Sequence, residues 1–246
     1  KLHKSHIESC ALESYKGLLD DVRFYNYALT DTDISNLYDT THAVLNAPKT
    51  VEIGKLFSWG TDVNERLGNG SNYTNTDSVR EAVNGDNFVQ VDTGDQFACG
   101  VNIDGKVYCW GDDTNGHLGN GSTYGSVDSP TYPVASLGNV KKVSAGSKHA
   151  CALLETGEIW CWGDTQGVTA LGDGVTTTTS QIPVQVTGNK DYVDVSAGYN
   201  HTCAVRQNGE AWCWGGGTGG QLGNAANSNS AIPVKVSTVN NFLQID

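Results

Sequence analysis

The sequence predicts an all-β fold built from successive copies of one small sheet. The dipeptide Trp-Gly recurs at Trp59, Trp110, Trp162 and Trp214, at intervals of 51, 52 and 52 residues. A constant period of this length is typical of stacked supersecondary units. Each of the last three copies also has two cysteines ten residues apart, the second directly before the Trp: Cys99 and Cys109, Cys151 and Cys161, Cys203 and Cys213.

The best-defined element of each copy is a β-hairpin. In the copy around Trp214, segments rich in Val, Thr, Cys and Trp flank Gln207-Asn208-Gly209. That tripeptide is typical of a three-residue hairpin loop whose glycine adopts the left-handed conformation. Centring the hairpin on Asn208 places Cys203 opposite Cys213, and directly opposed Cβ atoms lie about 4.5–5.5 Å apart.

We therefore expect a disulfide within each of the three hairpins. Buried free thiols and a metal site are the alternatives, but the sequence lacks the closely spaced cysteine pairs of zinc knuckles. In the first copy Pro48 and Ser58 stand at the two cysteine positions, and the joint loss of both cysteines is what a bonded pair predicts. Cys10 has no partner in this scheme.

Further strand patterns complete each copy. A Leu-Gly turn follows each Trp-Gly, and then come a proline-led segment such as residues 183–186 and a segment such as residues 192–195. Proline suits an outer edge strand because it lacks a backbone donor. About four strands per copy is the composition of one propeller blade. We predict a partial β-propeller of about 3.7 four-stranded blades over residues 46–246, with the last blade incomplete.

The motifs L-G-x-G, P-V, V-S-A-G, H-x-C-A and C-W-G recur in phase over residues 50–246. Together they resemble the regulator of chromosome condensation repeat, whose members build seven-bladed β-propellers. The cysteine pairs make this chain similar to the secreted or cell-surface branch of that family. The resemblance implies an open arc of blades, or a ring completed by residues outside this sequence or by a second copy. The nuclear exchange activity of the founding member is not carried over, because this chain is acidic and its cysteines are paired.

Residues 1–45 have no repeat character. Residues 17–25 follow the pattern G-x-x-D-D-V-R-x-Y, and residues 18–25 are expected to form a strand. Thr30 with Asp33 predicts the start of a short helix. This pattern resembles the closing segment of a laminin-G-like or concanavalin-like jelly roll. We expect residues 1–45 to be the tail of such a domain followed by a linker, since the segment is too short to fold as a jelly roll alone.

Composition narrows the range of partners and compartments. The chain has 27 acidic and 15 basic residues and a formal net charge of -12, which disfavours binding to nucleic acid. No apolar run approaches the ~18 residues of a membrane span, so no membrane insertion is expected. Three disulfides would imply an extracellular, periplasmic or lumenal setting, because such bonds persist in oxidising compartments. Of these settings, we expect the protein outside the cell or at the cell surface.

Eye-catching polar residues have simple structural explanations. His149 and His201 occupy the position that Phe97 fills in another copy, which favours a packing role. His117 lies in a loop and is expected at the surface. Residues 112–116 faintly resemble a calcium loop but lack its full carboxylate series, so an Asx turn is the favoured interpretation. We expect no catalytic residue and no cofactor, with calcium a weak alternative, and therefore no enzyme.

The predicted function is an extracellular binding or adhesion module that presents variable loops on a propeller scaffold. Its partner would be a protein or a glycan, and self-association is an alternative. A structural unit of a surface fibre and a secreted inhibitor of an enzyme are the other hypotheses. The loops that differ most between copies are residues 72–85, 124–129, 165–179 and 216–229, with Tyr73, Tyr124 and Tyr132 as candidate contact residues.

Overall fold

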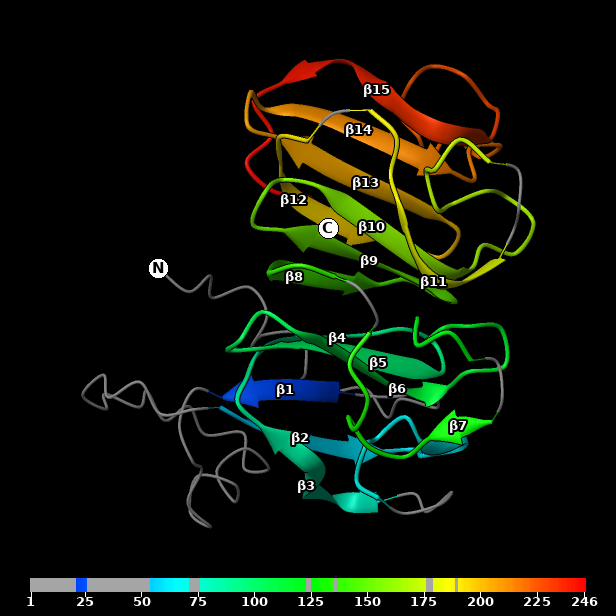
Figure 1. Cartoon of the computed structure of the whole chain (residues 1–246). Coiled ribbons are helices and arrows are strands. Elements are labelled where there is room, and N and C mark those ends of the chain that lie inside the picture. The colour runs from blue at the N-terminus through cyan, green and yellow to red at the C-terminus, as the bar shows by residue number, and fades with distance from the viewer. Residues whose placement is uncertain are drawn as a thin grey trace.

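The protein is an array of four antiparallel sheets that follow one another along the chain (Figure 1). The computed structural model describes residues 21–25, 54–70, 76–122, 125–134, 137–175, 179–188 and 190–246. Within each of the last three sheets, the four strands are hydrogen-bonded in sequence order. This arrangement confirms the prediction of four-stranded blades. The blade around Trp214, which was expected to be incomplete, has all four of its strands.

The first sheet contains three described strands and the other three contain four each. A short 3-10 helix, Val63–Glu65, follows the second strand. The strands are β1 (Asp21–Tyr25), β2 (Lys55–Gly60) and β3 (Thr76–Asp86); β4 (Phe88–Thr93), β5 (Phe97–Asn102), β6 (Val107–Asp112) and β7 (Ser126–Val127); β8 (Val140–Ala145), β9 (His149–Leu154), β10 (Ile159–Asp164) and β11 (Thr179–Gln185); and β12 (Tyr192–Ala197), β13 (His201–Arg206), β14 (Glu210–Gly215) and β15 (Ser230–Asn240).

The cysteine hairpins have the predicted register. Cys203 on β13 is paired with Cys213 on β14, and the glycine of the connecting turn, Gly209, has a φ of 77°. The Cα atoms of the two cysteines lie 4.0 Å apart and their sulfurs are bonded. Equivalent disulfides join Cys99 to Cys109 across β5 and β6, and Cys151 to Cys161 across β9 and β10.

Neighbouring blades interlock through the tryptophan of the Trp-Gly motif. The Trp162 ring lies on Gly119 of the preceding blade, and a Cβ added to this glycine would be 2.7 Å from Trp162 Cδ1. The indole Nε1–H donates to the carbonyl oxygen of His117 at 2.9 Å. Trp110 makes the same two contacts with Gly68 and Arg66. The glycine of the Leu-Gly motif therefore provides the surface on which the next blade rests.

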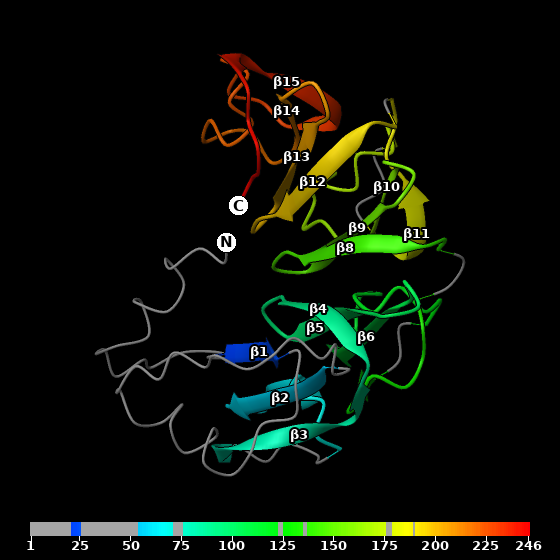
Figure 2. The same cartoon turned by 90° about the vertical axis from the view of Figure 1, so that its left-hand side faces the viewer.

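The innermost strands of adjacent blades are also tied by side chains. The amide group of Gln90 on β4 accepts from the Val143 N–H and donates to the Val143 carbonyl on β8, each at 2.8 Å. Lys142 on β8 pairs with Asp194 on β12 at 2.7 Å. Asp194 in turn accepts the N–H of Ile245, in the segment that follows β15. These contacts place β4, β8 and β12 side by side, as Figure 2 shows.

The first blade departs from the expected scheme. The predicted strand in residues 17–25 is present as β1, and it pairs with β2 so that Val22 faces Ser58. This is the position at which the other blades have their cysteine pairs, so the expectation that Pro48 stands opposite Ser58 is wrong. The assignment of residues 1–45 to a jelly-roll tail, and the predicted helix start at Thr30, fall almost entirely outside the described residues and stay predictions.

Candidate functional site

Two sets of loops meet at one end of every complete blade, and we call this end the loop face. The inner loops, residues 94–96, 146–148 and 198–200, join the first strand of a blade to the second. The outer loops begin after the Trp-Gly motif and join the third strand to the fourth. A backbone hydrogen bond ties each outer loop to its inner loop: Asp112 N–H to Gln96, Asp164 N–H to Lys148, and Gly216 N–H to Asn200, at 2.8–2.9 Å.

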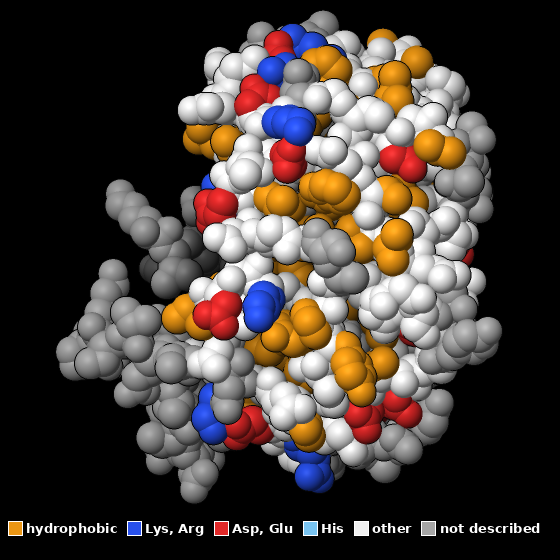
Figure 3. Space-filling view, viewed as in Figure 1, with side chains coloured by type: hydrophobic (Ala, Val, Ile, Leu, Met, Phe, Trp, Pro, Cys, Tyr) orange, Lys and Arg blue, Asp and Glu red, His pale blue; other side chains and the backbone are white. Residues whose placement is uncertain are grey.

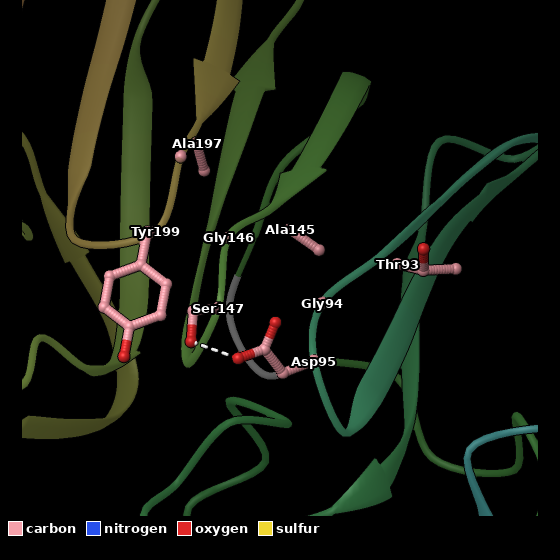
Figure 4. A pocket seen from close by; sticks show the side chains of 9 residues that line it. Thr93, Gly94, Asp95, Ala145, Gly146, Ser147, Ala197 and Tyr199 are labelled. Atoms are coloured by element: carbon pink, nitrogen blue, oxygen red, sulfur yellow. Dashed lines mark hydrogen bonds between the residues drawn. The ribbon is translucent and has the colours of Figure 1, made fainter. Parts of the chain in front are cut away.

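Glycines bring the inner loops of successive blades into close contact. A Cβ at Gly94 would lie 2.4 Å from the carbonyl oxygen of Gly146, and one at Gly146 would lie 2.3 Å from that of Gly198. No other residue type fits such an approach. The three loops surround a shallow depression of about 290 Å³, lined by residues 93–95, 145–147 and 197–199 (Figure 4).

One position of the inner loop differs between the three blades whose inner loops the structure describes. It holds Asp95, Ser147 and Tyr199, directly after the three glycines. The Ser147 hydroxyl donates to Asp95 Oδ2 at 2.6 Å and accepts from Gln166 Nε2 at 3.1 Å. Tyr199 is 63% exposed. The depression therefore combines a positioned carboxylate, a hydroxyl and an exposed aromatic ring on a floor that is mainly backbone.

Asp112 and Asp113 shape the outer loop of the second blade. The carboxylate of Asp112 accepts from the N–H and the hydroxyl of Thr114, and Asp113 accepts from the N–H of Leu118 at 3.1 Å. Burial raises the pKa of Asp112, but the neighbouring His117 imidazole and the hydrogen bonds from Thr114 outweigh burial and lower it overall. These contacts fit the favoured Asx-turn interpretation. Within the part of the chain that the structure describes, no group of His, Cys, Asp and Glu residues could hold a metal ion.

The expectation for His117 is wrong, because its side chain is buried. Only 1% of it is exposed, its ring stacks on Phe97 with centroids 5.5 Å apart, and its Nδ1 lies 3.3 Å from Asp112 Oδ2. His149 packs in the core as expected, with its Nε2 2.8 Å from the Thr202 hydroxyl. Burial lowers the pKa of His149 to about 4, with smaller contributions from neighbouring histidines. It is therefore neutral at pH 7 and has no access to solvent.

The predicted contact residues are only partly visible. Tyr132 is described and is 63% exposed, directly before the proline of an outer segment. Tyr73 and Tyr124 lie outside the described residues and stay predictions. Most of residues 72–85 form β3, so that stretch is a strand and not the loop expected from its sequence. Figure 3 shows hydrophobic side chains in several separate groups on one side of the array.

The sequence offered a signal for the inner-loop residues that the search for variable loops missed. Asp95, Ser147 and Tyr199 recur at intervals of 52 residues, directly after an invariant glycine of the repeat. The prediction considered only the stretches between Trp-Gly and Pro-Val. Equivalent positions with different side chains, inside an otherwise shared motif, would have identified the depression.

The sequence of the blades matches a known repeat family. Residues 104–153, 156–205 and 208–246 match the regulator of chromosome condensation (RCC1) repeat. The chain belongs to this family. A second description of the same repeat matches residues 88–116 and 192–221. Repeats of this family generally build scaffolds for binding or regulation, and the four sheets fit a partial β-propeller.

Several curated relatives and solved structures are similar to this RCC1-repeat chain. The ultraviolet-B receptor UVR8 of Arabidopsis thaliana is 31% identical over 76% of this chain and 43% of its own length. The human E3 ubiquitin-protein ligase HERC2 is 32% identical over 78% of this chain but only 4% of its own length. The chain therefore spans less than half of either relative.

Two solved structures share the fold. Prp20p from Saccharomyces cerevisiae, studied for its binding to Gsp1p and histones, has a TM-score of 0.67 at 21% identity, over 76% of this chain and 47% of that one. Human WBSCR16 has a TM-score of 0.65 at 23% identity, over 76% and 48%. Among the residues described for this protein, no helix is long and apolar enough to cross a membrane.

Proposed function

We propose that this chain is a protein-binding module of an extracellular or cell-surface protein, and that its loop face contacts the partner. The observation that carries the proposal is that the blades share their packing residues but differ at one position of the inner loop. Cysteine, tryptophan and glycine positions repeat: the cysteines close the hairpin within each blade, and the tryptophans and glycines fix the blades to one another. Asp95, Ser147 and Tyr199 occupy one equivalent position on the loop face and differ in size and charge, with a carboxylate, a small hydroxyl and a phenol ring. A rigid scaffold that presents dissimilar side chains at one end is suited to recognition.

The disulfides support the proposed compartment. Each of the three complete blades has one, and Cys99, Cys151, Cys109, Cys161 and Cys213 are almost completely buried. Bonds of this kind are rare in the reducing cytosol and common in secreted proteins. An adhesive role follows if the partner is itself on a cell surface.

An inhibitory role is a second candidate, favoured by Tyr199. A tyrosine that is 63% exposed at the centre of the loop face can insert into a cleft of a partner enzyme. Binding through the loop face is common to both roles. A fibre unit, in contrast, would bind copies of this chain.

Site-specific photo-cross-linking tests the proposal. A cross-linking residue is placed at Val175 or Asn227, which are exposed on outer loops, and the variants are incubated with extracellular fluid from the source. Matched controls carry it at Asp104 or Glu155, which are exposed on hairpin turns at the opposite end of the blades. We expect a discrete product from the loop-face positions alone. Products from the turn positions alone, or links only between copies of this chain, would contradict it.

A further inference from the structure

The depression at the centre of the loop face has the size of a subsite for one side chain. Its volume of about 290 Å³ lies at or below the lower end of pockets for whole small molecules, roughly 300–1,000 Å³. The close approach of Gly94, Gly146 and Gly198 leaves no room for a side chain of the protein itself on the floor. A partner would therefore reach this site with a single protruding group.

Asp95 supplies a carboxylate that is held in place through one oxygen and has its other oxygen available. Its Oδ2 accepts the Ser147 hydroxyl at 2.6 Å, which links two blades and orients the carboxylate. Among the described residues no hydrogen bond reaches Oδ1, and no cation lies within ion-pair distance of Asp95. Since this side chain is exposed, Oδ1 is available to a donor from a partner.

Among the described residues, no nearby Arg or Lys side chain forms an ion pair with the Asp95 carboxylate. Arg66 is fully buried, and its guanidinium donates to the carbonyl oxygens of Thr61 at 2.9 Å and Asp95 at 2.8 Å. It therefore binds the backbone of the inner loop and not the Asp95 carboxylate. Lys148 follows Ser147 in the same loop, and it makes no ion pair among the described residues.

Tyr199 adds an aromatic ring to the opposite side of the depression. In Figure 4 its ring and the Asp95 carboxylate lie on either side of Ser147. An aromatic face attracts a cation, and arginine also stacks on such a ring through its planar guanidinium. Arginine has five N–H donors, which suits a site that offers a carboxylate oxygen, a hydroxyl and backbone carbonyls.

We propose that the depression bounded by Asp95, Ser147 and Tyr199 binds an arginine side chain of the partner protein. The inference rests on the proposed function, because it names the chemistry of the group that the loop face receives. The net charge of -12 favours the approach of such a basic group.

Titration of the isotope-labelled chain with N-acetyl-arginine amide, followed by amide NMR, tests this subsite. We expect saturable shifts confined to residues 93–95, 145–147 and 197–199. Asp95→Asn keeps an acceptor for Ser147 but removes the charge, and it should weaken binding about tenfold. Asp104→Asn, the same change at an exposed turn on the other end, should leave binding unchanged.

A second pair of variants tests the aromatic contribution. Tyr199→Ala should weaken binding of the arginine probe more than that of N-acetyl-lysine amide, since stacking is lost. Ile103→Ala removes an exposed apolar side chain from a hairpin turn at the opposite end of the blades and should have no effect. Absence of shifts, shifts scattered over the acidic surface, or equal effects of Asp95→Asn and Asp104→Asn would overturn the subsite. Because this probe needs no natural partner, its failure would leave the cross-linking test of the loop face unaffected.

Discussion

The contact between tryptophan and glycine across blades leads to a quantitative prediction for Gly119→Ala. This glycine has a φ of 66°, and a left-handed conformation costs an alanine about 1–2 kcal/mol. The new methyl group would also be 2.7 Å from Trp162 Cδ1 and 2.8 Å from Nε1. Trp162 is fully buried and hydrogen-bonded to His117, so it cannot move aside freely. Overpacking of this kind costs about 1–3 kcal/mol.

The matched control is Gly167→Ala. Gly167 has a φ of 83°, but an added Cβ would meet nothing within 4 Å. The control therefore includes the conformational cost and omits the collision. We expect Gly119→Ala to lower the free energy of unfolding by about 2–5 kcal/mol, and Gly167→Ala by about 1–2 kcal/mol.

Urea unfolding followed by tryptophan fluorescence measures both variants. Stability can differ between repeats, so amide hydrogen exchange of β9 and β10 provides a local measurement beside the global one. Faster exchange in these strands is expected for Gly119→Ala only. Equal destabilisation by the two substitutions would refute the role of Gly119 as the contact surface for the Trp162 ring of the next blade.

Three further predictions concern the core. Replacing Cys151 and Cys161 together by Ala should lower the free energy of unfolding by about 2–3 kcal/mol in urea, because the bond closes a short loop in the unfolded chain; an unchanged midpoint would contradict this. Gln90→Ala leaves the buried Val143 N–H without its acceptor and should cost about 1–3 kcal/mol, measured by thermal unfolding. In the unfolded chain His149 becomes protonated below its ordinary pKa of 6.5, whereas burial lowers its pKa in the folded protein to about 4. The contribution of the neutral His149 to the free energy of unfolding is therefore complete above pH 6.5 and falls by about 3 kcal/mol near pH 4. His149→Phe should flatten that pH dependence, and an unchanged slope would contradict the buried neutral histidine.

The sequence predicted the hairpins well because their register depends on local chemistry. A turn glycine such as Gly209 fixes the centre of the hairpin, and the strand period of two then places Cys203 opposite Cys213. The four-strand unit followed from motifs that recur in phase. Both inferences use residues that are close in sequence.

Contacts between segments that are not joined by a short hairpin could not be predicted in this way. His117 was expected at the surface because Arg66 and Gln221 stand at its position in other copies, yet its ring stacks on Phe97 of the same blade. β1 joins β2 although about 30 residues separate them in the chain, and nothing in the pattern of residues 17–25 indicates that partner. The depression depends on three glycines from three blades, so it exists only after the blades have packed together.

The central claim is that the protein is an extracellular scaffold in which a disulfide closes each complete blade. The oxidation state of the six repeat cysteines tests this claim most directly. The measurement is mass spectrometry of a non-reduced digest of the protein from its natural source. We predict three cystine-linked peptides, joining Cys99 to Cys109, Cys151 to Cys161 and Cys203 to Cys213. Recovery of free thiols at these positions would contradict both the bonded blades and the extracellular setting.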